Sequence, residues 1–311
     1  MATRKDQPFA FETAEGRRID LANWYRGKSA FLIVNGKSLQ ALDLNALRER
    51  PGIVTMGVNN GWLYYRPNLW TCVDDVTHFA DVGWKDPSIL KFVPVGKKAH
   101  RLRIRKKDGS FAESSFRIRQ MPACLFYARN DEFNPDTFLT EPTVNWGMET
   151  HRKCPLGHKG SRSVMLAALR LLFYVGFRHV YIVGADFKME EDAQNYVFPQ
   201  DRTANSVKGN NSTFRILNDR FDATQPHFLE AGFHVHNCTP DSGLKSFPYV
   251  PYAEAVEMAS AECSKVIDSA GWYEGVKHPQ KGERAPRRKV RMEPPCQGDR
   301  IGQHMIVRAR P

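Results

Sequence analysis

The sequence predicts an α/β fold of the Rossmann-like, doubly wound type, with a mostly parallel sheet and a basic β-hairpin insertion. Three observations lead to this prediction. Short apolar runs recur along the chain, as expected for strands that helices cover on both faces. Helical periods separate some of these runs, which is typical of strand–helix alternation. One segment, residues 96–123, interrupts the alternation and carries a high density of basic residues.

The first expected strand, residues 29–35 (SAFLIVN), is a continuous apolar run that ends in a turn signal. The most distinctive helix is expected at 163–175, which is apolar on nearly every face, with Gly176 as its left-handed C-cap. Two further helices are expected at 219–231 and 253–269. The other expected strands are residues 53–58, 69–73, 91–95, 124–127, 179–183 and 233–238.

The interrupting segment has a KKDGS turn between two alternating stretches, which predicts an exposed β-hairpin. In this hairpin Leu102 and Ile104 are expected to face Phe116 and Ile118. The chain then divides into three parts. They are an N-terminal lead-in (1–28), a Rossmann-like nucleotide-binding catalytic domain (29–275, including the insertion 96–123) and a basic flexible tail (276–311).

Two segments hold the excess positive charge of this 311-residue chain, whose 45 Lys and Arg against 34 Asp and Glu give a net charge of +11. Clustered basic side chains gain free energy by releasing counterions from phosphates, so we expect a polyanionic partner such as nucleic acid. A solvated loop and a tail kept soluble by charge is the alternative. One segment is the tail, and the other comprises Lys97, Lys98, Arg101, Arg103, Arg105, Lys106 and Lys107.

The cellular location expected from the sequence is the cytoplasm. No apolar stretch approaches the length of a membrane span, and residues 1–16 lack the apolar segment of a signal peptide. The six cysteines form no CxxC pair, which favours reduced thiols over a disulfide framework. Closely spaced His and Cys residues at 151–158 and 234–238 invite a zinc site, but their spacing matches no standard zinc pattern.

Ligands of open α/β sheets bind where strands end at their carboxyl edges, so the turns after the strands are the candidate binding sites. After the first strand, Gly36 lets the backbone approach an anion and Ser38 can cap the next helix, beside Asn35. After the second strand, Asn59 and Asn60 offer paired carboxamides for a base or a sugar. Both segments also suit ordinary turns.

Two further turns carry acids. Asp74 and Asp75 follow a strand, where they can hold a divalent ion such as Mg²⁺ on a diphosphate or cap a helix. Ser161 and Ser163 open the buried helix, and Gly184 and Asp186 close the next strand. Small hydroxyls and free N–H groups opposite an acid predict a pocket for phosphate and ribose, although a plain cap and turn have the same sequence pattern.

Several segments together resemble a known superfamily: the Gly-Ser turn, the Asn-rich turn, the run into GFRHVYIVGADF, the Tyr196-Val197-Phe198 and Asn210-Asn211 segments, and HNCTPDSGL. This superfamily joins bacterial lipooligosaccharide sialyltransferases to 6-hydroxymethylpterin pyrophosphokinase-like proteins, including phage-encoded members. The similarity covers about residues 29–247 and is most specific at 163–187.

The resemblance implies a nucleotide-binding domain in which Asn35, Gly36, Ser38, Asn59 and Ser163 line the donor pocket. In the sialyltransferases a CMP-linked sugar is transferred with inversion and a histidine acts as general base. Arg215 stands at about that place here, where it would suit neutralising a leaving diphosphate. Asp186 or Asp219 is then expected to deprotonate the acceptor.

The leading hypothesis is therefore a glycosyltransferase-like enzyme that uses a CMP- or UDP-linked donor. Its acceptor hydroxyl is expected on a glycan, on a lipid-linked molecule or on a hydroxymethylated base of phage DNA, which the basic hairpin would bind. The alternatives are a pterin-type diphosphokinase that uses ATP and Mg²⁺, and a non-catalytic nucleic-acid-binding protein.

Overall fold

The structure, a computed structural model, describes residues 8–105, 111–149, 163–200 and 202–261. All of them belong to the first of two compact units, Met1–Val266. No helix in these ranges is long and apolar enough to cross a membrane.

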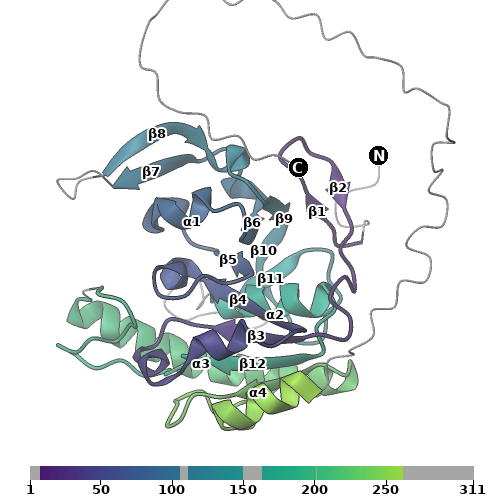
Figure 1. Cartoon of the computed structure of the whole chain (residues 1–311), viewed down its shortest axis with the longest axis vertical. Coiled ribbons are helices and arrows are strands. Elements are labelled where there is room, and N and C mark those ends of the chain that lie inside the picture. The colour runs from purple at the N-terminus through teal and green to yellow at the C-terminus, as the bar shows by residue number, and fades with distance from the viewer. Residues whose placement is uncertain (1–7, 106–110, 150–162, 201, 262–311) are drawn as a thin grey trace, which may run out of the picture. The chain divides into compact units, whose positions relative to one another are not determined.

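A nine-stranded sheet forms the centre of this unit, in the order β13-β12-β3-β4-β5-β6-β9-β1-β2 (Figure 1). Every neighbouring pair from β13 to β9 is parallel, whereas β1 pairs antiparallel with β9 and β2. The predicted mostly parallel α/β fold is thus confirmed. The strands are β1 (Phe11–Glu12), β2 (Arg18–Ile19), β3 (Ser29–Ile33), β4 (Ile53–Val58), β5 (Leu69–Thr71), β6 (Leu90–Pro94), β9 (Cys124–Tyr127), β12 (His179–Val183) and β13 (His234–Asn237).

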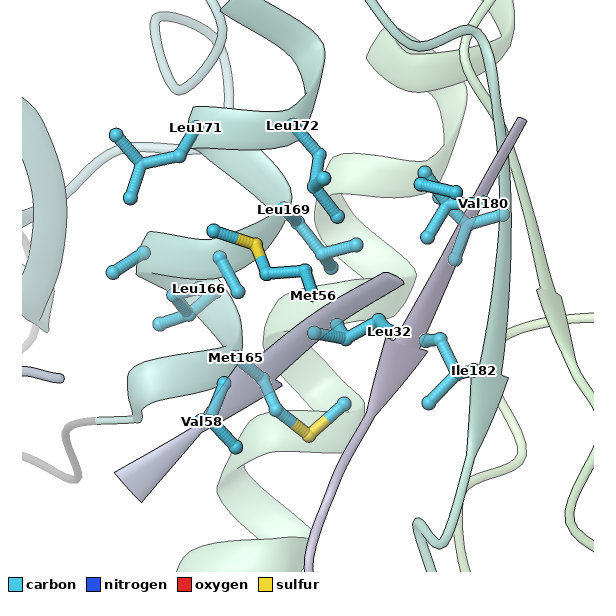
Figure 2. Close-up of a cluster of buried hydrophobic side chains, with 14 of the residues drawn as sticks. Leu32, Met56, Val58, Met165, Leu166, Leu169, Leu171, Leu172, Val180 and Ile182 are labelled. Carbon is cyan, nitrogen blue, oxygen red and sulfur yellow. The ribbon is translucent and has the colours of Figure 1, made fainter. Parts of the chain in front are cut away.

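Helices cover both faces of the sheet. Successive side chains of each strand point to opposite faces, and the side chains of β3 and β4 are buried at every position. Leu32 packs in the cluster that contains α2 (Val164–Tyr174) and α3 (Ala204–Glu230). Its neighbour Phe31 packs in the cluster that contains α4 (Tyr252–Ala261). Figure 2 shows the first cluster, in which the leucines of α2 meet Leu32, Met56 and Val58 on β3 and β4. Each fully buried leucine is worth roughly 1.5–3 kcal/mol, so α2 is firmly held against the sheet.

Helix α2 begins and ends at local signals in its sequence. The Ser163 side chain accepts a hydrogen bond from the Met165 amide at 3.1 Å, which caps the N-terminus. Gly176 has a φ of +111°, and the amides of Gly176 and Phe177 donate to the carbonyls of Phe173 and Leu172. This is a Schellman motif, and it confirms the predicted glycine C-cap.

The structure begins α3 at Ala204, 15 residues before the predicted start of this helix at residue 219. Its first half contains Asn, Ser, Thr and Gly, which favour turns in an isolated peptide. Two factors override this propensity here. The Thr203 side chain caps the helix on the Ser206 amide, and Val207 and Leu217 are buried against the protein.

The insertion forms the predicted antiparallel hairpin of β7 (Arg101–Arg105) and β8 (Phe111–Arg117), next to the short helix α1 (Asp81–Lys85). The predicted cross-strand partners are wrong, because an irregularity between Arg101 and Arg103 shifts the register and places Ile104 opposite Ala112. Leu102 and Ile118 are instead buried in a cluster with three tryptophans.

Two features of the sheet region were absent from the sequence-based prediction. Within the expected lead-in, β1 and β2 extend the sheet beyond β9. Strands β10 (Arg129–Phe133) and β11 (Val144–Glu149) form a separate two-stranded parallel sheet. These strands are short or polar, so their pairing depends on partners that are distant in sequence.

Candidate functional site

The winding of the sheet reverses at the boundary between β3 and β12. From β3 the chain proceeds to β4, β5 and β6 on one side, and it later returns to place β12 and β13 on the other side. Ligands of open α/β sheets bind at the carboxyl ends of strands at such a switch point. The residues that follow β3 and β12, Asn35-Gly36 and Gly184-Ala185-Asp186, line a cavity there.

This first cavity has a volume of about 180 Å³ and lies between the sheet, the start of α2 and one face of α3. It brings together residues from the four turns that the sequence analysis singled out. The predicted residues that line it are Asn35, Gly36, Asn59, Asp74, Ser163, Gly184 and Asp186.

Gly36 and Gly184 let the ends of β3 and β12 approach closely. The Gly36 amide donates to the Gly184 carbonyl at 2.8 Å. A Cβ on Gly36 would lie 2.5 Å from that carbonyl oxygen and 2.6 Å from the Asp186 carboxyl carbon. Gly184 has a φ of +73°, a conformation that favours glycine. Gly36 is therefore required by strand packing, whereas the sequence analysis had explained it by the approach of an anion.

Ser38 and Asp186 form a hydrogen-bonded pair across 148 positions of sequence. The Ser38 hydroxyl donates to Oδ1 of Asp186, and the Ser38 amide donates to Oδ2 at 3.3 Å. This pair fixes the Asp186 carboxylate just after the carboxyl end of β12, where Asp186 lines the first cavity. Ser38 thus acts through Asp186 and is not among the residues that line the cavity.

Two carboxamide oxygens in the cavity wall have no hydrogen-bond partner in the described part of the chain. They are Oδ1 of Asn35, a residue that is 8% exposed, and Oδ1 of Asn59. Asn59 also has a φ of +51°, and its carbonyl accepts from the Trp70 indole at 2.8 Å. Buried polar atoms are nearly always paired in native proteins, and strained backbone clusters at functional sites. Asn35 and Asn59 both line the cavity, so these two unpaired acceptors are candidates for hydrogen bonds from a ligand.

The N-terminus of α2 forms another wall, because Ser163, Val164 and Met165 all line the first cavity. The amide groups at a helix start and the helix dipole attract anions. Since Ser163 caps the helix and also lines the cavity, its two roles can be separated experimentally.

Replacing Ser163 with Ala is expected to lower stability by about 0.5–2 kcal/mol, because the Met165 amide loses its acceptor. Ser163→Asp retains a capping oxygen but adds negative charge, so it is expected to keep stability and to weaken the binding of nucleoside phosphates. Thermal unfolding with and without nucleotide measures both effects. An unchanged melting temperature for Ser163→Ala would contradict the capping role.

Residues of α3 that the sequence analysis assigned no role also line the first cavity. They are Asn210, Thr213, Phe214 and Leu217, at the i, i+3, i+4 and i+7 spacing of one helical face. Phe214 stacks on Phe187 with ring centroids 4.8 Å apart. The spacing would have identified this face if the start of α3 had been recognised.

Arg215 and Asp219, for which we predicted catalytic roles, do not line this cavity. Both side chains are exposed on α3. They follow Phe214 and Leu217 by one and two positions, which rotates them by about 100° and 200° away from the lining face.

Asn60 and Asp75 mainly stabilise their own turns. The Asn60 side chain donates to the His78 carbonyl and accepts from the Ala80 amide, both at 3.0 Å. Asp75 accepts from the Thr77 amide at 2.9 Å, and this hydrogen bond lowers the pKa of the Asp75 carboxyl. Asp75 is thus the cap that the sequence analysis had kept as an alternative. Within the described ranges no three His, Cys, Asp or Glu side chains are grouped as metal ligands.

A second cavity of about 640 Å³ adjoins the first and shares Asn35, Asn59, Asp74 and Tyr196 with it. Its other walls come from the turn at 77–79, the hairpin and the segment that follows Tyr196. The basic residues that line it are His78, Arg103 and Arg202.

The predicted nucleic-acid-binding residues separate into several environments. Lys98 is ion-paired with Glu12 at 2.6 Å and donates to the Thr13 carbonyl, so it connects the segment after β6 to strand β1. Arg101 is paired with Glu113 at 3.8 Å, and Lys97 lies outside both cavities. The Arg105 side chain and the predicted residues Lys106, Lys107 and Ser161 lie outside the described residues, as does the tail 276–311.

No family model matches the chain, and no curated protein matches it. One solved structure that is similar is that of the MAf glycosyltransferase from Magnetospirillum magneticum AMB-1, with a TM-score of 0.40 and 11% sequence identity. The similarity covers 83% of this chain and 40% of that protein, so the chain spans less than half of its length. A likeness at this level does not establish a function.

Proposed function

We propose that the chain is a glycosyltransferase-like enzyme that binds a nucleotide-activated sugar in the first cavity and transfers the sugar to an acceptor hydroxyl. The observation that carries this proposal is the pair of unpartnered carboxamide oxygens, Asn35 Oδ1 and Asn59 Oδ1, at the switch point of the sheet. A buried acceptor without a partner costs about 1–3 kcal/mol, and a ligand that donates to it recovers this cost.

The polar groups of the first cavity match the parts of a nucleoside phosphate. The start of α2 suits the phosphate, because its amides and its dipole favour negative charge. The Asp186 carboxylate, held by Ser38, suits the hydroxyls of the ribose. The oxygens of Asn35 and Asn59 accept from the amino group of a base or from further hydroxyls. A CMP- or UDP-linked donor satisfies all three requirements.

Asp74 is the group that we assign as general base. Its carboxylate lines both cavities and makes no hydrogen bond or ion pair with another described residue. In the proposed step Asp74 takes the proton of the acceptor hydroxyl, and the acceptor oxygen forms a bond to the anomeric carbon. The bond from this carbon to the phosphate oxygen breaks, and its electron pair leaves with the nucleotide.

A thermal-shift screen of the protein against CMP, UDP, GDP, ADP and ATP, with and without Mg²⁺, tests the proposal. A ligand that binds only the native state must stabilise it. A shift with a nucleoside mono- or diphosphate is expected and would identify the donor class. A shift with ATP and Mg²⁺ alone would instead favour a diphosphokinase, and the absence of any shift would overturn nucleotide binding.

The two carboxamides can be tested separately from folding. Asn35→Ala and Asn59→Gly are each expected to weaken the binding of that nucleotide by roughly tenfold, the loss of about one hydrogen bond to a ligand. Glycine is used at position 59 because it tolerates the φ of +51°. Isothermal titration measures the affinity, with Arg215→Ala as control because Arg215 lies outside both cavities. Unchanged affinity in both variants would exclude these oxygens from the site.

A further inference from the structure

We infer that the second cavity is the acceptor site and that it takes an acceptor bearing a phosphate group, bound by Arg103 and Arg202. This inference rests on the proposed function, since it assigns the first cavity to the donor. It names the chemistry of the second substrate, which the donor site leaves open.

The two cavities have the arrangement that a transfer between two bound substrates requires. They share a wall of Asn35, Asn59, Asp74 and Tyr196, so ligands in the two cavities meet there. The second cavity has about 640 Å³ against about 180 Å³ for the first, which leaves room for a larger molecule. The proposed base, Asp74, stands in the shared wall, where the hydroxyl of one ligand meets the activated carbon of the other.

The charge that lines the second cavity favours an anion. Arg103 comes from β7 of the hairpin, His78 from the turn after β5, and Arg202 from the segment before α3. Asp74 is the one acidic residue among the described residues that line the cavity. Two guanidinium groups from distant parts of the chain bind phosphate well, because their planar donor groups form paired hydrogen bonds with its oxygens.

Arg202 is held in place by the aromatic side chains beside it. Its guanidinium donates to the Tyr196 hydroxyl at 2.9 Å and lies 5.1 Å from the centre of the Tyr196 ring. Tyr196 is in turn stacked on Phe198, with ring planes 3° apart. Both aromatic residues line the second cavity. A guanidinium fixed in this way loses little side-chain entropy when it binds an anion.

Among the described basic residues of the hairpin, Arg103 is the one that lines the second cavity. Lys98 is engaged by Glu12, and Arg101 is paired with Glu113. Neither of them lines the cavity, whereas Arg103, two positions after Arg101, does. The hairpin thus contributes Arg103 specifically to the wall of the cavity. If the hairpin bound anions only through its general positive charge, Arg101 and Arg103 would contribute equally.

The test compares two double variants with the same change in net charge. Arg103→Gln with Arg202→Gln alters the cavity, and Arg101→Gln with Arg119→Gln alters exposed positions of the same basic region. Isothermal titration measures the binding of inorganic phosphate and of a short oligothymidylate, each with the first cavity saturated by the nucleotide from the thermal-shift screen.

We expect the cavity variant to lose affinity for at least one probe by about tenfold or more, the loss typical of charge-assisted hydrogen bonds, while the control variant stays close to the wild type. Loss for phosphate alone assigns a small phosphorylated acceptor, and loss that includes the oligothymidylate assigns a nucleic acid. Equal losses in both variants, or no loss in the cavity variant, would overturn the inference. If no nucleotide binds at all but phosphate binding still depends on the cavity arginines, the proposed function fails and the anion site stands.

Discussion

Asp74→Asn is expected to lower the rate of sugar transfer by about 10²- to 10⁴-fold, the usual contribution of a general base. The amide has nearly the shape of the carboxylate but cannot take the acceptor proton. Because Asp74 is exposed and unpaired among the described residues, the change is expected to have little effect on the free energy of unfolding. Donor affinity is expected to stay within about twofold of the wild type. The rate is measured as the release of nucleotide from a sugar donor that carries the nucleotide identified in the thermal-shift screen.

The pH profile separates a base from a residue that only positions the substrate. A general base must be ionised to accept a proton, so the wild-type pH profile is expected to have an acidic limb, in which the rate falls at low pH. This acidic limb should be absent in Asp74→Asn and present in the Arg215→Ala control. If Asp74→Asn raises KM without lowering kcat and retains the acidic limb, Asp74 does not act as the base.

Gly36→Ala is expected to destabilise the protein by roughly 3 kcal/mol and to abolish nucleotide binding at concentrations that saturate the wild type. The added methyl group would lie 2.5 Å from the Gly184 carbonyl oxygen and 2.6 Å from the Asp186 carboxyl, so the ends of β3 and β12 must separate. This movement displaces Asp186 and opens the switch point.

The matched control for this substitution is Gly209→Ala on α3, where an added Cβ would meet no atom within 4 Å. Alanine is the better helix former by about 1 kcal/mol, so this variant is expected to be as stable as the wild type or more stable. Urea unfolding measures both variants. Equal stability of Gly36→Ala and the wild type would contradict the close approach of the two strands.

The strands and helix that the sequence predicted well are those with strong local signals. Strands β4, β9 and β12 have the predicted bounds, because each is an apolar run between turn residues. Helix α2 lies between a serine cap and a glycine cap. These signals depend on neighbouring residues, so they can be read without a structure.

The candidate site was predicted in part for the same reason. Asn35, Asn59 and Asp186 were singled out because they follow strands, and a parallel sheet brings such turns to one edge. Arg215 and Asp219 lie outside the cavity, which the sequence did not indicate because the start of α3 was missed, and with it the helical face on which each residue lies. Asn210 and Phe214 were missed as lining residues for the same reason.

The sequence by itself therefore determined the α/β class, the hairpin and the edge of the sheet where the first cavity lies, because periodicity and turn residues are local properties. Only the tertiary structure decided that Ser38 holds Asp186, that Gly36 is required by the Gly184 carbonyl, and that Arg103 lines a cavity while Lys98 is engaged by Glu12. These contacts join residues far apart in the chain. Their free energies depend on distances and burial that arise only when the sheet has closed around its switch point.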